Sequence, residues 1–271
     1  MADYALLIVA MLITGGVGGI LAGLLGVGGG IVIVPVLEAA LTYLGVDEAI
    51  RMHVAVATSL ATIIPTSIAS SRAHHLRGAV DLELARRWAI SVLLGAVAGT
   101  IIAARVHSDV LSVVFAVVAF VVALKMVLPL EGRTLAPEVP TGPLVSIIPT
   151  GIGAVSSMMG IGGGTLSVAI LTMFNQPIHR AVGTAALFGL VISLPATIGF
   201  MVAGFGDPRL PPGSVGYVNL VGFALISPAT FLAAPLGAAI AHRLSRRRLS
   251  LLFGLFLLVV AARMFYRALD G

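Results

Sequence analysis

Several long apolar runs of this chain contain no Asp, Glu, Lys or Arg, and they limit its possible folds more than any other feature. They cover residues 5–25, 53–71, 143–160, 181–204 and 215–241. A helix needs about 20 predominantly apolar residues to cross the hydrocarbon core of a bilayer. Only 10% of the 271 residues are charged, whereas a soluble protein carries about a quarter. The runs therefore predict an all-α polytopic protein, multi-pass in a cell membrane of the bacterial inner-membrane type.

The charge and the cysteine count exclude several other classes. The formal net charge is +5, but the basic residues cluster in short loops between apolar runs, where they orient a chain against the cytoplasmic leaflet. We therefore expect a lipid bilayer as partner and no nucleic acid. The chain has no cysteine, which excludes thiolate metal sites and cysteine nucleophiles. We expect no metal and no cofactor, and we expect residues 5–25 to form an uncleaved first span.

Two glycine blocks carry the clearest sign of an internal repeat. "GVGGGIVIVPVL" from Gly26 matches "GIGGGTLSVAIL" from Gly160, and four weaker matches follow in the same order along the chain. Collinear matches predict a duplication. We assign residues 1–128 to a first transmembrane repeat, 129–142 to a proline-rich linker, and 143–271 to a second transmembrane repeat.

Each repeat supplies five hydrophobic segments, and this odd number gives the two repeats opposite orientations in the membrane. The first copy has segments at about 5–25, 31–45, 53–72, 86–105 and 109–128, and the second at about 143–160, 165–175, 181–204, 215–241 and 249–268. With both termini outside, ten of the 15 arginines fall in inside loops. The positive-inside tendency therefore favours two inverted-topology repeats.

The second segment of each repeat is too short to cross the membrane. It has about 15 residues after Gly30 and about 11 after Gly164, which gives about 22 Å and 17 Å of helix against a hydrocarbon core of ~30 Å. Such a helix begins near the midplane and leaves its first amides without intrahelical partners. Two of these helices would point their positive ends at one place, which suits a small anion. Short, glycine-interrupted segments at matching places also indicate a transporter's substrate site.

These considerations predict a set of substrate-binding residues. The backbone positions are Gly28, Gly29, Gly30, Gly162, Gly163 and Gly164, and the hydroxyls expected to donate to the same anion are Thr58, Ser59 and Thr184.

Other glycines and one acid have separate interpretations. Gly15, Gly19 and Gly23 are four residues apart, a spacing that lets transmembrane helices pack closely. Glu38 lies inside an apolar segment and is a candidate for coupling transport to protons, although it also fits a position near the outer surface.

Other function classes fit the chain less well. The glycine blocks lack the Lys-Ser/Thr pair of a nucleotide-binding P-loop. The apolar spans offer no Ser–His or paired-carboxylate arrangement for nucleophilic catalysis, so we expect no enzyme. A secondary transporter that works by alternating access fits best, and an anion channel with the same central pore is the alternative. Assembly into a homo-oligomer stays open.

The doubled glycine motif resembles a known family. "GLLGVGGGIVIVPVL" and "MMGIGGGTLSVAIL", followed by "AVATS" and "AVGTA", are similar to the TauE/SafE family of sulfite and organosulfonate exporters. The resemblance covers nearly the whole chain. It implies a carrier that exports a small sulfur-containing anion, with motif positions at the six glycines, Thr58 and Thr184. Ala185 departs from the serine that often follows the second threonine in that family.

Overall fold

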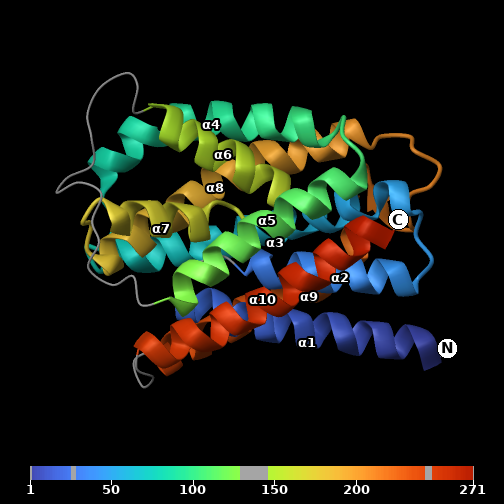
Figure 1. Ribbon diagram of the computed structural model, residues 1–271, viewed down its shortest axis with the longest axis horizontal. Coiled ribbons are helices and arrows are strands. Elements are labelled where there is room, and N and C mark those ends of the chain that lie inside the picture. Colours follow the sequence, from blue (N-terminus) through green and yellow to red (C-terminus); the bar gives the residue numbers. More distant parts are fainter. Residues whose placement is uncertain (1, 26–28, 129–145, 242–245, 271) are drawn as a thin grey trace.

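The prediction of an all-α chain is confirmed. The computed structural model describes residues 2–25, 29–128, 146–241 and 246–270, which form ten helices and one small β-hairpin (Figure 1). Five helices precede residues 129–145: α1 (Ala2–Leu25), α2 (Gly30–Tyr43), α3 (Glu48–Leu76), α4 (Leu82–Ala103) and α5 (Ser108–Val127). Five follow: α6 (Ile147–Met159), α7 (Gly164–Met173), α8 (Ile178–Ala203), α9 (Leu220–Ala241) and α10 (Arg246–Asp270). The predicted linker, residues 129–142, lies outside the described residues.

Four of the described helices are long and apolar enough to cross a membrane, namely α3, α4, α5 and α8. α3 has 29 residues and is the most buried of the four. Large apolar side chains such as Ile90 on α4 and Val121 on α5 are exposed, as expected for helices whose outer faces contact lipid. The structure thus agrees with a multi-pass membrane protein.

One predicted segment begins differently. We expected residues 215–241 to form a single apolar segment, but its start is a hairpin of β1 (Ser214–Val215) and β2 (Val218–Asn219), and the helix begins only at Leu220. Gly213 and Gly216 have φ angles of 77° and 54°, a left-handed backbone that glycine adopts at little cost. These two glycines turn the chain before α9 starts.

Each outer helix pair brings together helices from the two halves of the chain. α1 packs on α9, α4 on α6, and α5 on α10, while α3 and α8 pack on each other in the interior. Gly15 and Gly19 allow the first of these contacts, since a Cβ on Gly15 would lie 2.7 Å from the Cβ of Ala229 on α9. The prediction that glycines at this spacing serve close packing is confirmed for these two positions.

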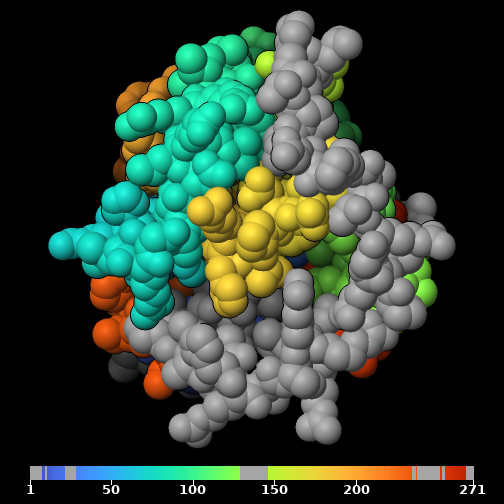
Figure 2. All heavy atoms as spheres, turned by 90° about the vertical axis from the view of Figure 1, so that its left-hand side faces the viewer, coloured from blue at the N-terminus to red at the C-terminus, as the bar shows by residue number. Residues whose placement is uncertain are grey.

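The two short helices run outward from the centre to opposite ends of the bundle. In Figure 1, α2 lies in the right half of the view and α7 in the left half. The start of α1 and the end of α10 lie at the same, right-hand end. Figure 2 shows the left-hand end, where the α3–α4 connection (cyan) lies beside the end of α7 (yellow). This end carries the exposed arginines Arg72, Arg77, Arg86, Arg87 and Arg180.

Candidate functional site

The two glycine blocks break the chain with the same backbone geometry. Gly29 precedes α2 with φ 76° and ψ −13°, and Gly163 precedes α7 with φ 77° and ψ −11°. Residues with a side chain rarely adopt this left-handed conformation, because the Cβ approaches the following carbonyl oxygen. Gly160 and Gly162 also have positive φ angles, of 70° and 64°. Gly28 lies outside the described residues.

The two glycine turns lie directly against each other. Gly30 packs on the α6–α7 turn so closely that a Cβ there would overlap the carbonyl oxygen of Gly160 and lie 2.9 Å from the Cα of Ile161. Ile63 of α3 contacts both blocks, since its side-chain atoms would lie 2.9 Å from a Cβ on Gly30 and 2.7 Å from one on Gly162. Segments separated by more than 100 residues thus meet at one side chain.

This meeting place lies halfway along the longest interior helix. Ile63 is the sixteenth of the 29 residues of α3, a helix about 43 Å long at 1.5 Å per residue. α2 has 14 residues and α7 has 10, or about 21 Å and 15 Å of helix. Each is shorter than the hydrocarbon core of ~30 Å. Both helices begin at the buried centre and end towards opposite surfaces, so their positive ends lie close together.

Ser59 ties α3 to this centre. Its hydroxyl donates a hydrogen bond to the carbonyl oxygen of Gly160 at 2.7 Å, and its side chain is fully buried. The hydroxyl proton of Ser59 is therefore already used in a hydrogen bond to the backbone of the α6–α7 turn. In this structure Ser59 holds the glycine turn in place.

Thr58 and Thr184 make matching contacts with the starts of two helices. The Thr58 hydroxyl accepts the backbone N–H of Asn219 at 2.9 Å, and the Asn219 side chain in turn accepts the N–H of Gly222 in α9. The Thr184 hydroxyl accepts the N–H of Asp81 at 3.0 Å, whose side chain accepts the N–H of Leu84 in α4. Each threonine supports the residue that caps a helix of the other half.

The structure places these two threonines far apart. Gly183, next to Thr184, packs on α3 at His74, since a Cβ on Gly183 would lie 3.2 Å from the Cβ of His74. His74 and Thr58 are 16 residues apart on α3, which corresponds to about 24 Å along a helix. In this structure the two hydroxyls therefore do not reach one small anion together, and a role of either threonine in substrate binding stays a prediction. They lie towards opposite ends of the bundle and stabilise helix starts.

A group of buried hydroxyls that the repeat pattern did not indicate lies in the second half of the chain. Their oxygen atoms have no hydrogen-bond partner in the described structure, and the residues are at most 7% exposed. They are Ser156 on α6, Thr165 and Ser167 on α7, and Ser193 and Thr197 on α8. The hydroxyl of a serine or threonine in a helix commonly donates a hydrogen bond to a carbonyl oxygen one turn back. The sequence alone does not show which hydroxyls lack this bond.

Among the described residues, no lysine or arginine is buried and available to an anion in the interior. Backbone amides, hydroxyls and the positive ends of helices are the groups that remain to stabilise a negative charge at the centre.

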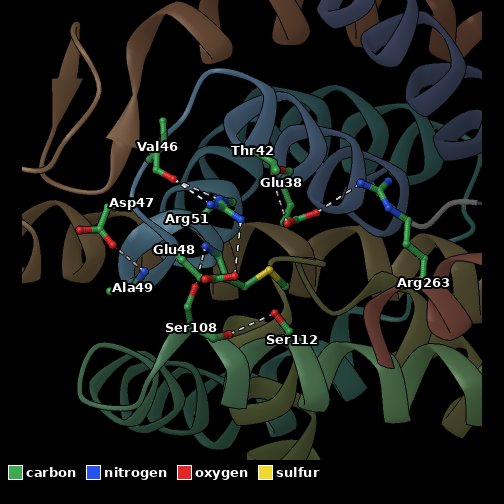
Figure 3. A network of polar contacts seen from close by, with 11 residues as sticks. Glu38, Thr42, Val46, Asp47, Glu48, Ala49, Arg51, Ser108, Ser112 and Arg263 are labelled. Carbon is green, nitrogen blue, oxygen red and sulfur yellow. Dashed lines mark hydrogen bonds and ion pairs between the residues drawn. The ribbon is translucent and has the colours of Figure 1, made fainter. Parts of the chain in front are cut away.

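Glu38 lies away from the glycine turns, beside a small polar cavity (Figure 3). It is 6% exposed, its Oε1 accepts a hydrogen bond from Thr42 at 3.2 Å, and its Oε2 lies 3.7 Å from an Arg263 nitrogen. The cavity of about 30 Å³ is lined by charged and polar residues of α2, α3 and α5 and by two methionines. This volume is enough for a water molecule. The lining residues are Glu38, Glu48, Arg51, Met52, Ser108, Asp109, Ser112 and Met264.

Two basic residues at matching positions contact the two short helices. Lys125 of α5 donates to the carbonyl oxygen of Ala169 in α7 at 2.8 Å, and Arg263 of α10 pairs with Glu38 of α2. Both cations approach the second half of a short helix, where the helix dipole is negative. Each short helix is thus held by the last helix of the other half.

The comparison with protein families decides the classification. The family described as "Sulfite exporter TauE/SafE" matches residues 11–264. The chain belongs to this family. The resemblance of its doubled glycine motif is therefore confirmed over nearly the whole length.

Relatives of this TauE/SafE protein carry consistent names. A "Probable membrane transporter protein" of Haemophilus influenzae is 35% identical, with 96% of this chain and 98% of the relative covered. A probable membrane transporter protein of Bacillus subtilis is 24% identical, with 98% and 99% covered. One from Methanocaldococcus jannaschii is 25% identical, with 95% and 97% covered. No solved structure matches the chain. The family and its relatives identify a membrane transporter.

Proposed function

We propose that this TauE/SafE protein is a secondary transporter that exports a small sulfur-containing anion, sulfite or a short organosulfonate, by alternating access. The observation that carries the proposal is the meeting of two left-handed glycine turns at the middle of α3. The turns at Gly29–Gly30 and Gly162–Gly164 bring the positive ends of α2 and α7 together at mid-depth. The description of the family as sulfite exporters agrees with the kind of anion that such a site attracts.

Alternating access requires two halves that can exchange roles, and the helix packing supports an inverted repeat. If each helix is replaced by its counterpart in the other half, the contact of α1 with α9 becomes the contact of α6 with α4. The α3–α8 and α5–α10 contacts each join a helix to its own counterpart and stay the same. In Figure 1, α1 and α6 run in opposite directions. Residues 1–128 and 143–271 are therefore proposed as the two repeats, which move against each other around a central site.

The packing of the centre favours a carrier over a channel. Gly29, Gly30 and Gly162–Gly164 are all buried, and Ile63 fills the space between the two blocks. A carrier closes its site between openings to the two sides, whereas a conducting channel keeps a continuous path for ions.

We further propose Glu38 as the residue that couples transport to protons. It is a buried acid on α2, the helix whose first residue lies at the glycine turns, and a polar cavity beside it provides room for water. The charged groups around it are Arg263 of α10, Glu48 and Arg51 of α3, and Asp109 of α5. Replacing Glu38 with Gln should abolish uptake driven by a pH gradient while exchange of substrate across the membrane continues. Equal loss of both activities would exclude this role.

Transport in proteoliposomes tests the function. Purified protein should take up radiolabelled sulfite or methanesulfonate with saturable kinetics, and unlabelled substrate on the other side should accelerate uptake. Currents in planar bilayers far above carrier turnover would instead establish the channel. Absence of any flux of sulfite and of short sulfonates would overturn the proposal.

A further inference from the structure

The two short helices share their backbone geometry but differ in the side chains of their first turn. α7 begins Gly164-Thr165-Leu166-Ser167, whereas α2 begins Gly30-Ile31-Val32-Ile33. Hydroxyls in α7 thus occupy the positions of isoleucines in α2. Ile31 and Ile33 are fully packed, at 1% and 0% exposure. Helical side chains tilt towards the N-terminus, so these differences change the surroundings of the first amides.

The first amides of the two helices also differ in how they are used. In α2 the N–H groups of Val32 and Ile33 both donate to the carbonyl oxygen of Gly29, at 3.0 Å and 3.1 Å. In α7 the first such bond runs from Ser167 to Gly163 at 2.9 Å. The amide of Leu166, which corresponds to Val32, makes no such bond, so the first turn of α7 has one more amide without a backbone partner than the first turn of α2. The amides of Gly164 and Thr165 precede the first intrahelical bond, as those of Gly30 and Ile31 do in α2.

Buried hydroxyls without partners surround this N-terminus. The Ser156 Oγ would lie 3.6 Å from a Cβ on Gly163, and Ser156 is fully buried. On α8, Ile192 packs against Gly163. Gly189, which lies one turn before Ser193, also faces the glycine turn, because a Cβ on Gly189 would lie 3.2 Å from the carbonyl oxygen of Gly162. Residues four apart share a helix face, so Ser193 lies on the face of α8 that meets the glycine turn.

Unpartnered hydroxyls are costly in a protein interior, and a bound ligand offers a reason for their presence. A buried polar group without a hydrogen bond loses its interactions with water and gains nothing in return. Ser156, Thr165 and Ser193 all carry this cost around one helix N-terminus. A ligand with several acceptor oxygens would satisfy the three hydroxyls and the free amides together.

We infer that the substrate oxyanion binds at the N-terminus of α7, with Ser156, Thr165 and Ser193 as hydrogen-bond donors, and not equally at both short helices. This inference rests on the proposed function and specifies its site. The ligand class is a small anion with an –SO₃ group, whose three oxygens accept hydrogen bonds from the hydroxyls and from the first amides of α7. Free sulfite and short sulfonates share this group. α2 closes the other side of the site with apolar side chains.

Ligand-induced thermal stabilisation of the purified full-length protein tests the inference. The probes are sulfite and methanesulfonate, measured separately on wild type and on Ser156→Ala, Thr165→Val and Ser193→Ala. Each substitution should weaken binding about threefold to tenfold. Without ligand, each variant should melt at the same temperature as wild type or higher, because it removes an unsatisfied buried hydroxyl.

Thr230→Val is the matched control. Its hydroxyl is fully buried but donates to the carbonyl oxygen of Ile226 in its own helix, at 2.8 Å, so the variant should keep wild-type affinity. If sulfite or methanesulfonate stabilises wild type and all three variants equally, the inference is wrong while the proposed function stands. If neither anion binds wild type, the proposed function itself fails. Because the three variants lie on three helices, failure of one to fold leaves two that decide the question.

Discussion

The left-handed backbone at Gly29 and Gly163 explains why glycine occupies both positions. Both φ angles lie within 1° of each other, so the same local break is made twice. The sequence was sufficient to predict this feature, because consecutive glycines weaken a helix strongly. It was not sufficient to identify Ser156 or Ser193. A hydroxyl in an apolar helix looks the same in the sequence whether it bonds to its own backbone or faces a ligand.

Replacing Gly163 with Ala tests the role of this backbone. The left-handed conformation costs a residue with a side chain about 1–2 kcal/mol, and the new Cβ would also displace the Ile192 side chain. We expect a lower melting temperature and loss of sulfite transport.

Gly151→Ala is the control for this prediction, because nothing lies within 4 Å of its Cβ position in α6. Alanine there should leave the protein unchanged or more stable, by up to about 1 kcal/mol. Similar losses of stability in the two variants would show that the left-handed turn is not what Gly163 provides.

Among the helices, the lengths were easier to predict than the contacts. The shortness of α2 and α7 follows from the distance between a glycine block and the next polar turn. The hairpin before α9 was missed, because "GSVGYVNL" reads as apolar and its two glycines give no sign of their φ angles. The roles of Thr58 and Thr184 were missed for a different reason. Matching positions in two inverted repeats lie on opposite sides of the midplane unless they are close to it, so sequence correspondence does not imply proximity.

The cap contacts predict how Thr58→Val and Thr184→Val behave. Each substitution removes the acceptor for one backbone N–H at the start of α9 or α4. A buried donor left unpaired costs about 1–3 kcal/mol, so both variants should melt at lower temperature. Their sulfite affinity should stay at the wild-type value, as measured by titration calorimetry. A loss of sulfite affinity in either variant, with an unchanged melting temperature, would instead show that this threonine binds the substrate.

At the scale of the whole molecule, the packing agrees with the proposed inverted repeat. If each helix is replaced by its counterpart in the other half, most helix contacts become other observed contacts. Lys125 and Arg263 likewise contact counterpart helices, α7 and α2. Thr58 and Thr184 contact the starts of α9 and α4, which are also counterparts. Collinear matches in the sequence were enough to propose the duplication. The pairing of α1 with α9 and of α4 with α6 was not, because any small-residue face fits any other such face.

Cysteine labelling tests the orientation of the chain. The natural sequence contains no cysteine, so a single introduced thiol is a unique reporter. Leu76 at the end of α3 and Phe205 after α8 are 77% and 82% exposed, and they lie near opposite ends of the bundle. The arginine-rich end that includes Leu76 should face the cytoplasm. In intact cells an impermeant maleimide should label Phe205→Cys and spare Leu76→Cys, and the reverse pattern would contradict the proposed topology.

The most direct measurement of the central claim is the position of a bound anion. Crystals of the protein soaked with a bromine-substituted short sulfonate would give an anomalous signal that locates the ligand independently of its surrounding density. The account predicts a peak beside the first turn of α7, between Gly163–Thr165 and the hydroxyls of Ser156 and Ser193. A peak in the cavity lined by Glu38 and Arg51, with none at the glycine turns, would contradict it.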